Sequence, residues 1–407
     1  ESSPTRQRRL IWEMLDHSID GEVLLEVGEE VRNNLMESMD EKSLVAATKG
    51  LDVDDLADLL DELPETVVKQ ALQGMDYQYR TRLETVMNYD EDTAGGLMNT
   101  DTITIRPDVT LDVVLKYLRL KKEIPNNTDN IIVVDKYNHY LGTLSVTNLL
   151  CADPENTVSE TMNQDYISIG SNTLAGAVAN IFEDRDLISA PVVDKNNILL
   201  GRTTIDDVVD VIREESESTV LNMAGLTDEE DIFAPVLPSA RRRAIWLGIN
   251  LITALIASGV ISLFQDTIEK VVALAVLMPI VASMGGIAGS QTLTLVIRGI
   301  ALGNISSTNS KSLLIKEISV GLLNSLLWAC VIGLLSSHWF NNYLIGVVIG
   351  IAMIANLVFA ALSGVLIPII LKRIGVDPAL GGGVILTTIT DVIGFFSFLA
   401  LGTILLL

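Results

Sequence analysis

Cysteine is almost absent from this chain of 407 residues. Its two cysteines, Cys151 and Cys330, lie far apart in the sequence, so they predict neither a disulfide framework nor the closely spaced ligands of a zinc site. The first 20 residues are polar and include RQRR, which does not favour a secretory signal. We therefore expect the polar part of the chain to lie in a reducing cytosol.

Positive charge is also scarce, since 28 Lys/Arg face 52 Asp/Glu and the formal net charge is −24. Residues 241–407 hold nine Lys/Arg and five Asp/Glu, which leaves 19 and 47 in residues 1–240 and a net charge of −28 there. A surface this acidic repels phosphate backbones and the anionic cytoplasmic leaflet. This charge excludes nucleic acid as a partner and indicates cations.

The acids do not form the dense DxDxDG loop with a following bidentate Glu that calcium favours. Magnesium is held by one or two carboxylates while it keeps several waters, so scattered acids are sufficient for it. Cations that bridge opposed acidic domains would favour a compact arrangement of these domains, and their loss would let the domains separate, so the domains could act as a cation sensor. For each acid taken alone, the alternative to a cation ligand is an acid on a solvated helix face.

Long apolar runs fill the second half of the chain. Five stretches match the length of about 20 residues that a helix needs to cross a hydrocarbon core; they lie near residues 244–264, 271–297, 313–336, 343–371 and 380–406. A soluble helical core would not carry so many long stretches with almost no charge. The sequence therefore predicts a multi-pass protein of the lipid bilayer.

Basic residues between the spans predict the orientation. Only Lys270 falls on one side of the spans, and the other side holds Arg241, Arg242, Arg243, Arg298, Lys311, Lys316, Lys372 and Arg373. By the positive-inside rule, we expect a bacterial-type plasma (inner) membrane protein with its N-terminus in the cytosol and its C-terminus outside.

One carboxylate stands out within the spans, Asp391 in the run TTITDVIGFF. A carboxylate at this depth costs several kcal/mol unless a cavity, a partner or a cation compensates. Thr387 and Gly383 precede it at one-turn intervals, so a small, polar face runs along this helix. The pattern indicates a site for a hard, hydrated cation, and a packing carboxylate bonded to a neighbouring hydroxyl is the alternative.

The second span has no charge but contains Pro279 and three glycines in its middle. Gly285 and Gly289 form a small-xxx-small pair that allows close helix packing. Alternatively, the backbone here is locally unwound and lines a water-filled path, whose residues would be Gly285, Gly286, Gly289, Ser290, Gln291 and Thr292. Both interpretations stay open on the sequence alone.

Residues 98–217 contain an internal repeat, because IIVVD at 131–135 and APVVD at 190–194 align, as do MNTDTITI at 98–105 and MNQDYISI at 162–169. Each copy predicts a short strand, a helix, two strands and a closing helix, which resembles a tandem pair of CBS domains. Such pairs often bind adenine nucleotides. The resemblance places phosphate and ribose contacts at Thr204 and Asp207 of the second copy, where the first copy has Ser145 and Asn148.

The remaining polar segments are expected to be helical. Residues 5–90 predict short amphipathic helices in a small superhelix, and IDDVVDVIREESEST at 205–219 predicts an acidic helix followed by a linker with Pro235 and Pro238. The expected fold is a multidomain membrane protein. Its parts are a helical acidic N domain (1–97), two α/β CBS domains (98–158 and 159–205), an acidic connecting, plug-like helix and linker (206–240), and an all-α domain with five transmembrane helices (241–407).

This domain order, together with GGIAGSQ at 285–291 and DPAL…TTITD at 377–391, resembles the MgtE magnesium channels and the related solute-carrier magnesium carriers of animals. The resemblance implies a homodimer, not an enzyme, whose pore is lined by the second and fifth spans. Asp391 would face a hydrated Mg²⁺, the Thr387 carbonyl would assist, and Asp377 would tie the gate to the sensor. ATP would bind in the CBS domains. Sensor ligands would be Asp52, Asp54, Asp58, Asp186, Asp207, Asp210 and Glu215.

The chain departs from the family pattern at several positions, which are Gly176, Glu183, Ser218, Thr219, Ile287 and GGGV at 381–384. Weakened gating and an altered pore mouth are expected from these changes. Transport of manganese or cobalt, and coupling to sodium or protons, need the same carboxylate and stay open. An intramembrane aspartyl protease would need two buried carboxylates, and a nucleotide sensor without transport would not need Asp391.

Overall fold

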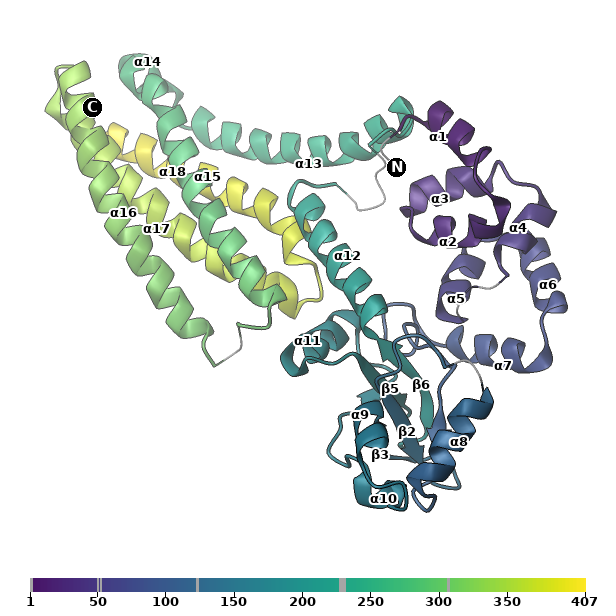
Figure 1. Ribbon diagram of the computed structural model, residues 1–407. Helices are drawn as coiled ribbons and strands as arrows, with labels where there is room; N and C mark the ends of the chain where they lie inside the picture. The colour runs from purple at the N-terminus through teal and green to yellow at the C-terminus, as the bar shows by residue number, and fades with distance from the viewer. Residues whose placement is uncertain (1–2, 50, 52, 122–123, 227–231, 306–307) are drawn as a thin grey trace. The chain divides into compact units, whose positions relative to one another are not determined.

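The computed structural model describes residues 3–49, 51, 53–121, 124–226, 232–305 and 308–407 (Figure 1). The chain divides into two compact units. The first comprises Glu1–Ser216 and Glu229–Ala234, and the second comprises Glu217–Asp228 and Pro235–Leu407.

Short helices build the start of the first unit, as the sequence predicts: α1 (Thr5–Trp12), the 3₁₀ helix η1 (His17–Ile19), α2 (Asp20–Leu25), α3 (Glu29–Met36), α4 (Glu41–Ala47), α5 (Val53–Asp61), α6 (Glu65–Gly74) and α7 (Tyr77–Val86). Some of the acids begin helices, because Asp40 accepts a bond from Ser43 N and Asp76 one from Tyr79 N. The apolar faces meet in a core in which Leu24, Leu56 and Leu83 are fully buried.

Arg32 of α3 holds these helices together at one edge. It donates to Glu62 Oε1 at 2.7 Å and to the carbonyls of Leu24 and Val27. One guanidinium therefore donates hydrogen bonds both to carbonyls at the end of α2 and to a carboxylate after α5, and so links these two helices.

The repeat forms two three-stranded sheets of identical design. In the first, β1 (Thr104–Ile105) runs parallel to β2 (Asn130–Val134), and β2 pairs antiparallel with β3 (Tyr140–Ser145); β4 (Ile169–Gly170), β5 (Ser189–Val193) and β6 (Leu199–Thr204) repeat this order. The accompanying helices are α8 (Leu111–Lys121), α9 (Val146–Cys151), α10 (Val158–Thr161), α11 (Ala175–Arg185) and α12 (Ile205–Met223). The predicted CBS topology is confirmed.

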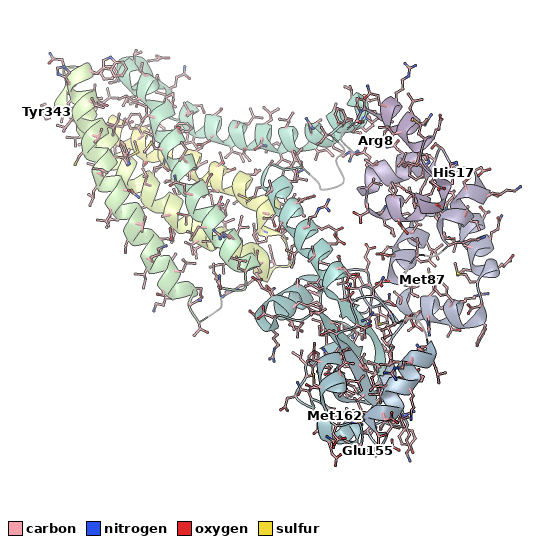
Figure 2. All side chains as sticks on the ribbon, in the orientation of Figure 1. Arg8, His17, Met87, Glu155, Met162 and Tyr343 are labelled. Carbon is pink, nitrogen blue, oxygen red and sulfur yellow. The ribbon has the colours of Figure 1, made fainter. Side chains whose placement is uncertain are left out.

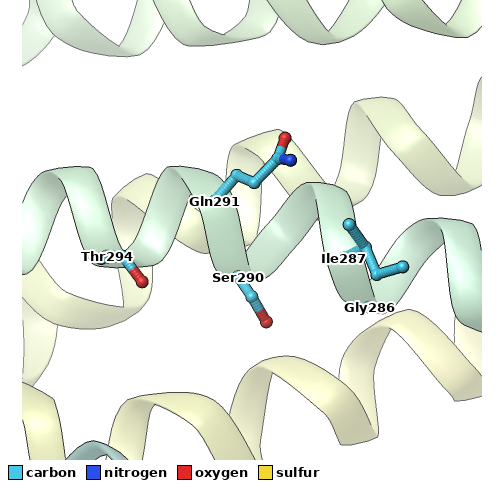
Figure 3. Close-up of a pocket in the computed structure, with 5 residues that line it drawn as sticks. All are labelled: Gly286, Ile287, Ser290, Gln291 and Thr294. Carbon is cyan, nitrogen blue, oxygen red and sulfur yellow. The ribbon is translucent and has the colours of Figure 1, made fainter.

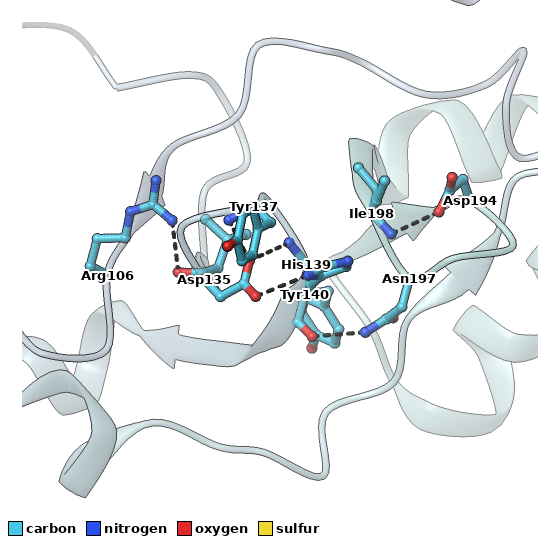
Figure 4. A network of polar contacts seen from close by, with 9 residues as sticks. Arg106, Asp135, Tyr137, His139, Tyr140, Asp194, Asn197 and Ile198 are labelled. Carbon is cyan, nitrogen blue, oxygen red and sulfur yellow. Dashed lines mark hydrogen bonds and ion pairs between the residues drawn. The ribbon is translucent and has the colours of Figure 1, made fainter.

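The two sheets are joined by a reciprocal exchange between their turns. Asn197 Nδ2 donates to Tyr140 O at 2.9 Å (Figure 4), and Asn138 Nδ2 donates to Leu199 O at 3.0 Å. Both asparagines have a positive φ, which Asn tolerates better than most residues. Since Asn138 and Asn197 are equivalent in the repeat, the two copies are related by approximate twofold symmetry.

The second unit is helical. In its described residues, five helices are long and apolar enough to cross a membrane: α13 (Val236–Ser262), α15 (Val272–Ala301), α16 (Ser310–Trp339), α17 (Tyr343–Arg373) and α18 (Pro378–Leu406), with the short α14 (Gln265–Lys270) before α15. Helix α17 packs against α15, α16 and α18 and is the most buried of the five.

The ends of the membrane helices differ in chemistry. Trp339 closes α16 and Tyr343 opens α17 (Figure 2), and both side chains are about 70% exposed. At the other end of α17 lie Lys372 and Arg373. Aromatic residues favour the membrane interface, and basic ends favour the cytosolic side.

The linker before the first span is shorter than the sequence predicts. Pro235 is the N-cap of α13, and Pro238 together with Arg241–Arg243 lies inside that helix. A proline in the first turn removes an N–H that has no helical partner there, so it does not end the helix. The expectation that Pro238 belongs to a linker is therefore wrong.

Candidate functional site

Helix α18 carries the carboxylate that the sequence singles out. Asp391 is half-buried, and among the described residues it forms no hydrogen bond or ion pair. One turn earlier, the Thr387 hydroxyl donates to Gly383 O at 2.9 Å, and the Thr387 carbonyl accepts from Thr390 Oγ1 at 3.0 Å. The alternative of a packing carboxylate bonded to a neighbouring hydroxyl is therefore not what the described residues show.

Helix α15 runs without interruption past Pro279, so its backbone is not unwound in this structure. Its small residues divide between two faces. Gly285, Gly289 and Thr292 are buried, and a methyl group at Gly289 would lie 2.9 Å from Leu386 Cδ1 of α18. Close packing accounts for these three residues.

The other face of α15 lines an open depression of about 480 Å³, formed by Gly286, Ile287, Ser290, Gln291 and Thr294. Ser290 and Thr294 project from the same side of the helix (Figure 3), as their four-residue spacing requires. Gly286 has no neighbour within 4 Å of where its methyl group would be. This face offers hydroxyl and amide groups together with empty volume.

The register of α15 and α18 brings Asp391 to the level of this depression. The helices pack antiparallel, with Gly289 at the level of Leu386 and Gly382 at the level of Leu293. Five residues forward from Leu386 on α18 correspond to five back from Gly289 on α15, so Asp391 lies level with Met284, two residues before Gly286, where the depression begins. Gly383 of α18 is also open, with nothing within 4 Å of an added methyl group.

Asp377 is the N-cap residue of α18. Its Oδ1 accepts from Ala379 N at 2.8 Å as the N-cap, and Pro378 follows at the first helical position. Its second oxygen accepts from Asn222 Nδ2, near the end of α12, at 3.0 Å. The Asn222 amide also donates to Ser218 Oγ at 3.1 Å. Asp377 therefore connects the start of α18 with the end of the acidic helix.

Among the buried polar side chains of the membrane helices that the sequence did not single out, Glu317 and Asn356 are the largest. Glu317 of α16 is 6% exposed; Lys316 Nζ lies 2.7 Å from its Oε1, and Thr292 Oγ1 lies 3.4 Å from its Oε2. Asn356 of α17 is fully buried. A Lys–Glu pair within a span was the available signal for Glu317, and a single amide in the apolar run 343–371 was the signal for Asn356.

The acids of the first unit repel one another around the start of α12. Burial, and then the neighbouring Asp206, raise the pKa of Asp207 to about 7, with a further contribution from Asp55 of α5. Burial and Glu26 raise the pKa of Asp210. Carboxylates of the N domain and of α12 thus lie near one another, and Arg213 partly offsets the effect of Glu26 on Asp210.

The predicted sensor ligands do not converge on one point. In the part of the chain that the structure describes, no group of three His, Cys, Asp or Glu side chains could hold a metal ion. Asp54 is buried, while Asp58, Asp186, Asp210 and Glu215 are exposed; Asp52 lies outside the described residues. Asp186 ends α11 in the left-handed conformation, and a methyl group at Gly176 would lie 2.8 Å from Glu215 Oε1.

The predicted nucleotide contacts lie at the start of α12. Thr204 N donates to Asp207 Oδ2 at 3.3 Å, and the Thr204 hydroxyl lies 3.0 Å from the same oxygen. The long loop of the first copy reaches this region, since Asn127 Nδ2 donates to Asp206 Oδ2 at 2.8 Å. In the first copy, Ser145 Oγ accepts from Asn148 N at 3.1 Å, with an amide in place of the carboxylate.

Comparison with known proteins agrees with this arrangement. Residues 278–401 match the divalent cation transporter model of MgtE, residues 1–92 match the MgtE intracellular N domain, and residues 94–155 and 158–214 each match a CBS domain. The magnesium transporter MgtE of Thermus thermophilus is 32% identical over 87% of this chain and 80% of its own length. The chain belongs to the MgtE family.

A second MgtE relative, the magnesium transporter of Bacillus subtilis, is 30% identical over 89% of this chain and 80% of its own length. Among solved structures, the cytosolic domain of the Mg²⁺ channel MgtE in complex with ATP is similar, with 28% identity, a TM-score of 0.45, and coverage of 52% of this chain and 91% of that one. The family is one of membrane transporters and not of enzymes. The predicted family and fold class are confirmed.

Proposed function

We propose that this MgtE protein carries Mg²⁺ across a bacterial-type plasma membrane along the face formed by Asp391, Thr387 and Gly383 of α18 and by Gly286, Ser290 and Gln291 of α15. The supporting observation is Asp391 itself, a carboxylate within a membrane helix that has no partner among the described residues. An intramembrane charge without a protein partner is best compensated by a cation and its water. The hydroxyls and amide beside it suit a hydrated ion.

The path requires a second copy of the chain. In one chain, Thr387, Ser290 and Gln291 are exposed, although they belong to helices whose surroundings are hydrocarbon. Polar groups in contact with lipid are costly, and twofold symmetry would place the same face opposite itself and enclose the water. The proposal is therefore a homodimer whose pore lies between the two copies, with the basic helix ends and the N-terminus in the cytosol and the C-terminus outside.

The test of the ion path is replacement of Asp391. In magnesium-starved cells, Asp391→Ala is expected to lower Mg²⁺ uptake at least tenfold, equivalent to about 1.4 kcal/mol in an equilibrium constant. Asp266→Ala, which removes an exposed carboxylate from α14, is the matched control and should transport normally. Undiminished uptake by Asp391→Ala, at equal amounts in the membrane, would exclude this path.

We further propose that cytosolic cations gate this path through α12. Burial and neighbouring carboxylates raise the pKa values of Asp207 and Asp210 where the N domain meets α12, and divalent cations would neutralise negative charge there. The end of α12 bonds Asp377, the cap of the helix that carries Asp391. Limited proteolysis of the whole protein should slow with millimolar Mg²⁺, and identical digestion with and without Mg²⁺ would argue against a sensor.

Adenine nucleotide binding is proposed for the second CBS copy alone, at Thr204 and Asp207. The first copy has Asn148 where the second has the carboxylate that would bond a ribose hydroxyl. Equilibrium dialysis of the whole protein with ATP should show binding that Thr204→Ala weakens and Ser145→Ala does not. Equal losses in both variants would refute this assignment.

A further inference from the structure

The most buried membrane helix contains an amide that the proposed ion path does not use. Asn356 lies in the middle of α17 with no exposed surface. Its Nδ2 donates to Val281 O of α15 at 2.8 Å, and its Oδ1 has no partner in the described residues. Leucine would fill a similar volume in an apolar bundle without an unpaired acceptor, so packing alone does not explain an amide here.

Two glycines make room for this amide. A methyl group at Gly285 of α15 would lie 2.3 Å from Asn356 Nδ2, and a methyl group at Gly394 of α18 would lie 2.7 Å from the same atom. Both distances are too short for real contacts, so a larger residue at either position would have to displace the Asn356 amide. The amide of α17 is thus wedged between α15 and α18.

This wedge lies at the depth of the candidate path. Gly394 follows Asp391 by one turn of α18, and Gly285 precedes Gly286, the first residue of the depression. Asn356 therefore contacts both helices at the level of the path. On α18 its contact, Gly394, lies on nearly the same face as Asp391, and on α15 Gly285 lies about a quarter of a turn from Gly286.

The segment of α15 that Asn356 contacts has a low intrinsic helix propensity. Pro279 removes one helical hydrogen bond, and the glycines from Gly285 onward lower helix propensity. A hydrogen bond from a neighbouring helix to Val281 O gives this segment an attachment that its own sequence does not supply.

We propose that Asn356 is a positioning residue for ion selectivity. Its amide sets the separation between α15 and α18 at the level of Asp391, and thereby the width available to a hydrated divalent cation. The inference rests on the proposed ion path. Hydrated Mg²⁺ needs near-ideal octahedral geometry, whereas Ca²⁺ accepts irregular sites. A change in the spacing of α15 and α18 therefore alters the discrimination between the two ions. It has a smaller effect on the amount of protein and on its insertion into the membrane.

The experiment compares Asn356→Leu with Asn250→Leu, the same substitution at an exposed amide of α13 that bonds only within its own helix. Proteoliposomes with equal protein are assayed for uptake of Mg²⁺ and Ca²⁺ over a range of concentrations. Asn356→Leu is expected to raise the half-saturating Mg²⁺ concentration about tenfold and to lower the Mg²⁺/Ca²⁺ uptake ratio by a similar factor. An unchanged ratio in Asn356→Leu overturns the proposal.

A second pair of variants separates positioning from packing and remains informative if Asn356→Leu does not reach the membrane. Gly394→Ala refills the space that Asn356→Ala leaves empty, so the double variant restores packing without the hydrogen bond to Val281. A double variant with normal selectivity means that the amide only fills space, which overturns the proposal; continued loss of selectivity supports it. Asp391→Ala is assayed in parallel, because only unchanged uptake in that variant would refute the ion path itself.

Discussion

Removing the charge of Asp207 tests the electrostatics of the first unit most directly. This carboxyl lies in the first turn of α12, where burial and Asp206 raise its pKa to about 7. Asp207→Asn keeps the size of the side chain and an oxygen that can still accept from Thr204 N. The variant therefore removes the charge and little else.

The expected effect follows from the two pKa values. An Asp in an unfolded chain has a pKa of about 3.9, so between about pH 4 and pH 7 the unfolded segment releases a proton that the folded one keeps. The stability that this group contributes is complete below about pH 4 and is lost as the pH rises through about 7. A difference of about three pKa units corresponds to about 4 kcal/mol, and partial solvent access reduces this to about 2–4 kcal/mol.

Native-state hydrogen exchange of the whole protein in detergent measures the local stability around Asp207 as a function of pH. Peptides from β5 to α12 should lose protection between pH 5 and pH 8, after correction for intrinsic exchange rates, and Asp207→Asn should abolish most of this loss. Asp112→Asn, at an exposed carboxylate that pairs with Lys116 on α8, should behave like the unmodified chain. Equal pH dependence in Asp207→Asn and the unmodified chain would refute the argument. Added Mg²⁺ at pH 8 should restore protection only where Asp207 is intact.

Three further substitutions test packing and hydrogen bonding. Arg32→Met is expected to destabilise the N domain by about 2–3 kcal/mol, because it leaves carbonyls and a carboxylate unpaired. This loss would be measured as faster proteolysis within α1–α5. Asn197→Ala should cost about 1–2 kcal/mol by removing the bond to Tyr140 O, measured as faster exchange in both turns of the repeat; unchanged exchange would contradict the reciprocal contact. Gly364→Val should cost about 1–3 kcal/mol because a methyl group there already lies 2.9 Å from a backbone carbonyl of α15, seen as a lower aggregation temperature in detergent. Gly248→Val, at an open position of α13, should leave that temperature unchanged.

Length and periodicity were sufficient to locate most elements. The spans expected at 343–371 and 380–406 are observed as Tyr343–Arg373 and Pro378–Leu406. A membrane helix must satisfy its own backbone over a set thickness, so composition alone determines its extent closely. The repeat located the β-strands for a similar reason, because buried strands read as short apolar runs between turns.

The sequence was less informative where a residue's role depends on its neighbours. Pro238 was assigned to a linker because proline ends helices in general, whereas its position in a first turn is harmless. Glu317 was passed over because its neighbour Lys316 suggested a helix end in water, while the structure buries Glu317 against Thr292. Both errors come from judging a residue type without its surroundings.

By itself, the sequence determined that an acidic, polar half precedes five membrane helices and that Asp391 is the carboxylate within them that needs an explanation, because charge and hydrophobicity are properties of composition. Only the tertiary structure decided which small residues of α15 pack and which line the depression. Gly285 and Gly289 share a four-residue spacing, and so do Gly286 and Ser290, so local spacing favours neither pair. The choice is made by Asn356 and Leu386 on distant helices, whose approach no local pattern encodes.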